Sequence, residues 1–211
     1  MSDSRTHEPI AIIGLSCLFP GAVTPDEYWQ NLVNGLDTTS LATEEQFGAD
    51  PGVYFDPKRR RTDTTYSLRG GYVRAPIDIP EGMDKTAGWS LYVAREALND
   101  SGYLHRAGEL ARCGLILGNL SFPTQESHSL LASVYNPVLE QAICELTGIN
   151  EFQLPAAARA HAPATVLRSP AAVVADTLRL GGPQFCIDAA CASSLYAVGL
   201  ACAMLSDGQA D

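Results

Sequence analysis

Cys191 stands where a predicted strand gives way to a predicted helix. The apolar run Gln184–Ile187 predicts the strand, and apolar residues that recur every three or four positions after Cys191 predict the helix. Such a turn lifts a side chain clear of its own backbone, and it directs amide N–H groups and the positive end of the helix dipole toward the sulfur. Both features favour a thiolate, so we expect Cys191 to act as a nucleophile near neutral pH.

The other cysteines and the histidines suggest no competing chemistry. No two cysteines form a C-x-x-C pair, and the four histidines are scattered without the spacing of metal ligands. We therefore predict no metal site. Buried, unpaired thiols are expected at the five other cysteines, which are Cys17, Cys113, Cys144, Cys186 and Cys202.

Alternating strands and helices are expected to position the cysteine. Two further apolar runs, residues 9–16 and 113–117, predict buried strands. N-cap residues, helical periodicity and terminal glycines predict helices over residues 25–34, 84–101, 124–147 and 169–180. The third helix is expected to kink or divide at Pro137. Because the strands are apolar throughout, we predict an α/β fold with a mostly parallel sheet covered by helices.

Length and charge limit the classes of function. The chain of 211 residues is long enough for one domain with a core, which we expect at residues 9–211. Its net charge of −10 argues against nucleic acid as a partner, and no apolar run is long enough to span a bilayer. Residues 1–8 are polar and lack an apolar signal core, so we expect a disordered lead-in to a cytoplasmic protein without a membrane partner.

Residues 58–61 form a basic cluster, Lys-Arg-Arg-Arg, within a stretch rich in turn residues. The simpler interpretation of this cluster is a solvated loop. The alternative is a docking patch for an acidic partner domain.

Four segments, in the same order along the chain, resemble the β-ketoacyl synthases, which are the condensing enzymes of fatty-acid and polyketide synthases. DAACASS at residues 188–194 follows a glycine–proline turn and a short strand, and it resembles their active-site elbow. The upstream segments are EPIAIIGLSCLFPGA, then YWQNLVNG, and then RGGYV followed by AREALNDSGY. The short stretch at residues 74–93 and GNLSFPT at residues 118–124 are more similar to ketosynthase domains of bacterial polyunsaturated-fatty-acid synthases than to the modular type.

The resemblance implies a thiolase-like fold, of which this chain corresponds to the N-terminal half and ends just after the nucleophile helix. It implies that Cys191 accepts an acyl group from a thioester on the phosphopantetheine arm of an acyl carrier protein, and that no cofactor is bound directly. The Cys191 backbone N–H would be one donor of the oxyanion hole. Ser193 and Ser194 match positions that are usually small, and we interpret them as packing and capping residues.

Condensation would follow acyl transfer. A malonyl–carrier thioester is decarboxylated in this family, and its carbanion attacks the acyl-cysteine to give a β-ketoacyl product. The two histidines that decarboxylation needs lie in the second half of the family's fold, and none of the four histidines here matches their motifs. We therefore expect this chain alone to be incomplete for condensation, and we expect it to form a homodimer or to pair with a ketosynthase-like partner.

Two alternatives to a ketosynthase remain. A non-catalytic partner subunit of the chain-length-factor type would keep the fold, but such partners usually replace the cysteine that is retained here at position 191. A cysteine-based acyl hydrolase would need a G-x-C-x-G elbow, whereas Ala189 and Ser193 occupy the two glycine positions.

Overall fold

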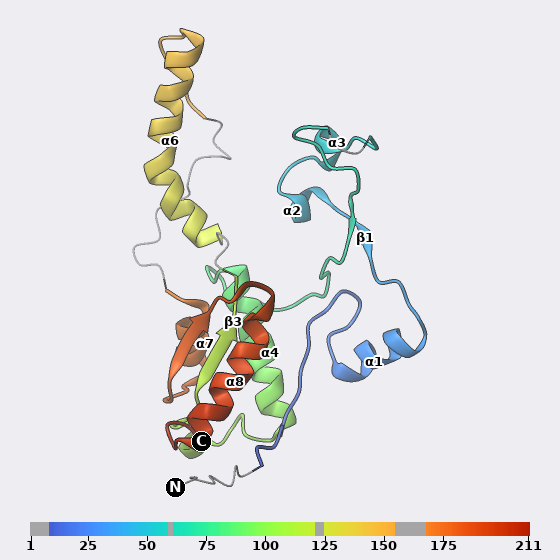
Figure 1. The fold of residues 1–211 in the computed structure, drawn as a ribbon, viewed down its shortest axis with the longest axis vertical. Helices are drawn as coiled ribbons and strands as arrows, with labels where there is room; N and C mark the ends of the chain where they lie inside the picture. The colour runs from blue at the N-terminus through green and yellow to red at the C-terminus, as the bar shows by residue number, and fades with distance from the viewer. Residues whose placement is uncertain (1–8, 59–60, 121–124, 155–167) are drawn as a thin grey trace, which may run out of the picture.

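A two-stranded parallel sheet forms the centre of the computed structural model, which describes residues 9–58, 61–120, 125–154 and 168–211 (Figure 1). Strand β3 (Leu115–Gly118) pairs with β4 (Gln184–Ile187), with Leu115 opposite Gln184 and Gly118 opposite Ile187. The two strands therefore end side by side, and the chain leaves β4 beside the end of β3. The lead-in expected at residues 1–8 lies outside the described residues.

Three helices surround this sheet. Helix α8 (Ser193–Ser206) packs mainly on β3, α7 (Pro170–Leu178) contacts both strands, and α4 (Lys85–Asp100) packs against α7. A short helix, α5 (Ala107–Leu110), leads into β3. The buried core lies where α7 meets its neighbours and contains Ala171, Val174 and Ala175, all at 0% exposure. A parallel sheet covered by helices agrees with the predicted α/β class.

The starts of α1 and α7 follow the local signals expected for them. Helix α1 (Pro25–Val33) begins with a capping box, in which the Thr24 hydroxyl accepts from the Glu27 amide and the Glu27 carboxylate accepts from the Thr24 amide. The Ser169 hydroxyl likewise accepts from the Ala172 amide at the start of α7. Helix α7 ends at Leu178, two residues before the predicted end, and the left-handed residue that caps it is Arg179, with φ of 58°, rather than a glycine.

The strand predicted at residues 9–16 is wrong. These residues run alongside α4, where the Leu15 amide donates to the Asp100 carboxylate at 2.8 Å and the Ser16 hydroxyl donates to the Val93 carbonyl at 2.6 Å. Because a strand exists only through hydrogen bonds to a neighbouring strand, a segment whose polar groups bond to a helix does not become one. A cavity of about 570 Å³ separates this segment from the β3 side of the sheet.

Two parts of the chain lie away from the sheet (Figure 1). Residues 36–58 and 61–70 carry β1 (Ser40–Leu41) and β2 (Arg69–Gly70), which pair antiparallel, with α2 (Glu44–Phe47) and α3 (Pro51–Tyr54) between them. Helix α6 (Gln125–Thr147) extends outward and remains one helix through Pro137, where a kink or a division was predicted. Among the helices of the described segments, none is long and apolar enough to cross a membrane.

Candidate active site at the turn between β4 and α8

Cys191 lies at the abrupt turn that joins the central sheet to α8. Strand β4 ends at Ile187, the 3₁₀ turn η2 (Ala190–Ala192) contains the cysteine, and α8 starts two residues after it. Cys191 is exposed, as expected for a side chain lifted clear of a strand-to-helix turn. Its position is therefore the predicted one, and its role as nucleophile stays a prediction.

The amides that flank Cys191 are used within the turn itself. The Ala190 amide donates to the Asp188 carboxylate at 3.0 Å, and the Ala189 amide donates to the Ser193 hydroxyl at 2.9 Å. The amides of Ala192 and Ser193 donate to the carbonyls of Ala189 and Ala190, respectively. The Cys191 amide is not among these donors, which makes it available to an oxygen atom that approaches the thiol.

The backbone of the turn is strained at Ala190, whose φ is +49°. An L-residue other than glycine in this left-handed region costs about 1–2 kcal/mol, because its Cβ crowds the following carbonyl oxygen. Strain of this kind persists only where the surrounding contacts hold it. Nothing in the residue type predicted it, since glycine is the usual sign of a positive φ.

Ser193 has a larger part in the turn than the sequence indicated. Its side chain is buried, and its hydroxyl both accepts from the Ala189 amide and donates to the Ala190 carbonyl, the latter at 2.7 Å. The predicted packing role is correct for Ser193, whose hydroxyl also bridges the turn before the helix. Ser194 is exposed and the N-cap of α8 is Ala192 without a side-chain hydrogen bond, so the predicted capping role is wrong. A small polar residue just after the cysteine was the available signal, because serine side chains commonly bond to nearby backbone.

The other cysteines differ from Cys191 in exposure. All six thiols are free, and Cys191 is exposed whereas Cys17 is buried and the remaining four are partly buried. Burial raises the pKa of the Cys17 thiol, and the nearby Glu27 carboxylate raises it further. Burial also raises the pKa of the Cys113 thiol. These two thiols are therefore disfavoured as thiolates. Cys202, on the α8 helix that follows the Cys191 turn, is the natural reference for reactivity.

Exposed apolar side chains continue from the turn along α8. Leu195 is 75% exposed, and Tyr196 and Val198 are also largely exposed. Residues of the opposite side are buried toward the sheet, as Ala197 shows. Within the described residues, α8 therefore packs on the sheet with one side and presents an apolar surface with the other.

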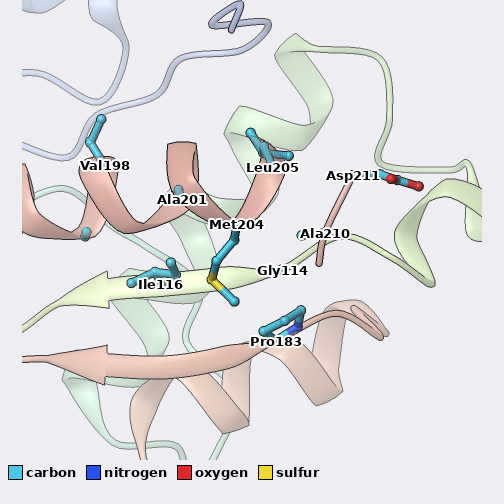
Figure 2. Close-up of a pocket in the computed structure, with 10 residues that line it drawn as sticks. Gly114, Ile116, Pro183, Val198, Ala201, Met204, Leu205, Ala210 and Asp211 are labelled. Carbon is cyan, nitrogen blue, oxygen red and sulfur yellow. The ribbon is translucent and has the colours of Figure 1, made fainter. Parts of the chain in front are cut away.

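A hollow of about 260 Å³ lies between α8 and the beginnings of β3 and β4 (Figure 2), whereas Cys191 follows the end of β4. Gly114 and Pro183, which precede the two strands, form its floor, and Met204 projects toward them from α8. Asp211 lies at its edge and forms an ion pair with Arg112 at 2.5 Å. Because the strands run between this hollow and the turn, the hollow is not part of the cysteine site.

The basic cluster at residues 58–61 is only partly described. Arg61 pairs with Asp56 at 2.5 Å, while Arg59 and Arg60 lie outside the described residues. The backbone amide of Lys58 and the Arg61 side chain both hydrogen-bond the Asp56 carboxylate and lower its pKa. The docking patch therefore stays a prediction. In the described part of the chain, no three side chains of the kind that bind metals gather at one point.

These features define a class of protein, an α/β domain that presents an exposed cysteine between a parallel strand and a helix. Comparison with known proteins identifies the family. Residues 7–211 match the family described as beta-ketoacyl synthase, N-terminal domain. The chain belongs to the β-ketoacyl synthase family, as its sequence segments predicted.

Named relatives cover nearly the whole chain. The PKS-NRPS hybrid synthetase ATPKS of Aspergillus niger is 27% identical over 222 residues, which include 99% of this chain and 11% of the relative. A polyunsaturated fatty acid synthase of Thraustochytrium sp. is 27% identical over 215 residues, with 99% of this chain and 10% of the relative covered. The chain thus spans about a tenth of the length of these curated relatives.

A solved structure supports the fold. The PfaC keto synthase–chain length factor superposes with a TM-score of 0.76 at 38% identity, over 95% of this chain and 23% of that one. The predicted thiolase-like α/β fold is therefore confirmed, and the chain corresponds to an N-terminal ketosynthase region.

Proposed function

We propose that this chain performs the acyl-accepting step of a β-ketoacyl synthase, with Cys191 as the nucleophile. The observation that carries the proposal is the turn between β4 and α8. Cys191 is exposed there, directly before a helix, and four neighbouring amides are used inside the turn while the Cys191 amide is not. A thioester can thus reach the sulfur and an amide donor at the same residue.

The reaction is a thioester exchange. The Cys191 thiol loses its proton, and the thiolate attacks the carbonyl carbon of an acyl thioester. Negative charge develops on the carbonyl oxygen, which the Cys191 amide stabilises by a hydrogen bond. The bond to the donor sulfur then breaks, the donor leaves as a thiol, and the acyl group remains on Cys191.

In the complete protein, the donor would be the phosphopantetheine arm of an acyl carrier protein. The acyl-cysteine would then accept the carbanion from a decarboxylated malonyl–carrier thioester, giving a β-ketoacyl product. Residues outside this chain would supply the two histidines for that second step. The apolar surface of α8 around Leu195 and Tyr196 supports association with a second protein layer, either a second copy or a ketosynthase-like partner.

The test is self-acylation of the whole chain by hexanoyl-pantetheine, followed by peptide mapping with mass spectrometry. We expect the hexanoyl group on Cys191 and its loss in the Cys191→Ala variant. The matched control is Cys202→Ala, which removes a thiol from α8, the helix that follows the Cys191 turn, and should leave acylation unchanged. Equal acylation of Cys191 and Cys202, at rates no higher than those of a free thiol, would contradict the proposal.

The second candidate is a non-catalytic partner protein. The similarity to a keto synthase–chain length factor gives this candidate its support, because that protein's name joins the two roles. In such a partner, Cys191 would be exposed but would not accept an acyl group. The absence of acyl transfer from hexanoyl-pantetheine, together with tight association with an active ketosynthase, would favour this second role.

A further inference from the structure

The Ser193 hydroxyl hydrogen-bonds the backbone of two consecutive residues, Ala189 and the strained Ala190. It accepts from the Ala189 amide at 2.9 Å and donates to the Ala190 carbonyl at 2.7 Å. Ser193 is 6% exposed, and it is the only polar residue among the buried ones in the described part of the chain. A buried hydroxyl that both accepts and donates a hydrogen bond is satisfied within the protein.

These bonds act on the residue that precedes the cysteine. Ala190 has a φ of +49°, and relaxation of this angle to a negative value would change the direction of the chain into Cys191. The Ser193 hydroxyl restrains the Ala190 carbonyl, and the Asp188 carboxylate restrains the Ala190 amide at 3.0 Å. Ala190 is therefore held on both of its peptide groups.

The helix side of this bridge is itself anchored to the sheet. Gly118, at the end of β3, lies so close to the first peptide of α8 that an added Cβ would stand 2.8 Å from the Ser193 carbonyl carbon. The contact with Gly118 thus fixes the Ser193 backbone, and the Ser193 side chain restrains a turn that would otherwise relax. The sheet, Ser193 and Ala190 form a continuous chain of contacts that ends at Cys191.

We propose that Ser193 is a positioning residue for the Cys191 nucleophile, because its hydroxyl holds the left-handed turn that keeps the thiol exposed and the Cys191 amide outside the turn's hydrogen bonds. Ser193 does not touch the substrate. This inference rests on the proposed role of Cys191, and it adds to that role the residue on which the geometry depends.

The test compares Ser193→Ala with Ser194→Ala, which removes a hydroxyl from the adjacent, exposed residue. Two readouts are measured on the whole chain, the hexanoylation rate of Cys191 and the ratio of Cys191 to Cys202 alkylation rates with iodoacetamide. We expect Ser193→Ala to lower hexanoylation by about tenfold or more, since misplaced reacting groups lose rate steeply. The alkylation ratio should fall as well, and Ser194→Ala should preserve both values.

A rescue variant separates positioning from general damage. Glycine tolerates a positive φ without strain, so adding Ala190→Gly to Ser193→Ala should restore part of the Cys191 rate. An unchanged alkylation ratio in Ser193→Ala, or an equal loss at Cys191 and Cys202 without rescue by glycine, would overturn the inference. The proposed function fails separately if wild-type Cys191 is alkylated preferentially but never hexanoylated. In that case the alkylation ratio still tests whether Ser193 positions the Cys191 thiol.

Discussion

Gly118 and Ser193 are in backbone contact, although 75 positions separate them in the sequence. A Cβ built on Gly118 would lie 2.8 Å from the Ser193 carbonyl carbon, 2.8 Å from the Ser194 nitrogen and 3.0 Å from the Ser193 oxygen. All three atoms belong to backbone, so no side-chain rotation can relieve such a contact. The end of β3 therefore determines how closely α8 can start beside the sheet.

Gly118→Ala is expected to destabilise the protein and to shift the start of α8. Overpacking against fixed backbone costs about 1–3 kcal/mol in the free energy of unfolding, and urea denaturation measures this loss. The matched control is Gly199→Ala within α8, where an added Cβ meets nothing within 4 Å. That control should gain about 0.5–1 kcal/mol, because alanine is the better helix former. Equal effects of the two substitutions would show that the contact does not constrain the turn.

Val174→Ala is expected to lower the free energy of unfolding by about 2 kcal/mol, since it removes two methyl groups from a fully packed site. Val174 is 0% exposed on α7, which lies between α4 and the sheet. Val173→Ala, at a partly buried position of the same helix, makes the same chemical change and should cost less than about 1 kcal/mol. Thermal or urea unfolding of both variants checks the difference, and a costlier change at Val173 would place the core elsewhere.

Asp37 is expected to titrate at unusually low pH. Its carboxylate accepts from the Thr39 hydroxyl at 2.6 Å, from the Thr39 amide at 2.9 Å and from the Arg69 guanidinium at 3.0 Å, and these bonds lower its pKa from 3.8 to about 2. Because the folded pKa is the lower one, the stabilisation is present above the unfolded value and disappears as the pH falls through about 2.

Thr39→Ala should raise the pKa of Asp37, because it removes the hydroxyl that lowers it most. Thr39→Ser keeps a hydroxyl and should leave the pKa low. Titration of the Asp37 side-chain carbons by nuclear magnetic resonance distinguishes the two variants. A pKa that stays near 2 in Thr39→Ala would assign the effect to the two remaining donors, the backbone amide at position 39 and the Arg69 guanidinium.

The sequence alone determined the features that depend on neighbouring residues. The capping box at Thr24 and Glu27 and the serine cap of α7 were predictable, because each involves residues three positions apart. The strand Gln184–Ile187 and the turn at Cys191 were also predictable from adjacent residues, because an apolar run is followed there by a helical pattern. The resemblance of DAACASS to a family elbow strengthened this prediction.

Only the tertiary structure decided the features that depend on distant partners. Residues 9–16 have the composition of a strand, yet their polar groups bond to α4 at Val93 and Asp100, so no ladder forms. The left-handed backbone of Ala190 is not indicated by its residue type, and the Asp188 and Ser193 side chains that hold it are its neighbours in the sequence. The distant partner is Gly118, whose close approach to the Ser193 backbone fixes the position from which Ser193 holds the turn. A residue pattern indicates the conformation that a segment favours, whereas contacts across the fold decide which conformation it adopts. At the Cys191 turn, the deciding contact is that of Gly118, at the end of β3, with the Ser193 backbone.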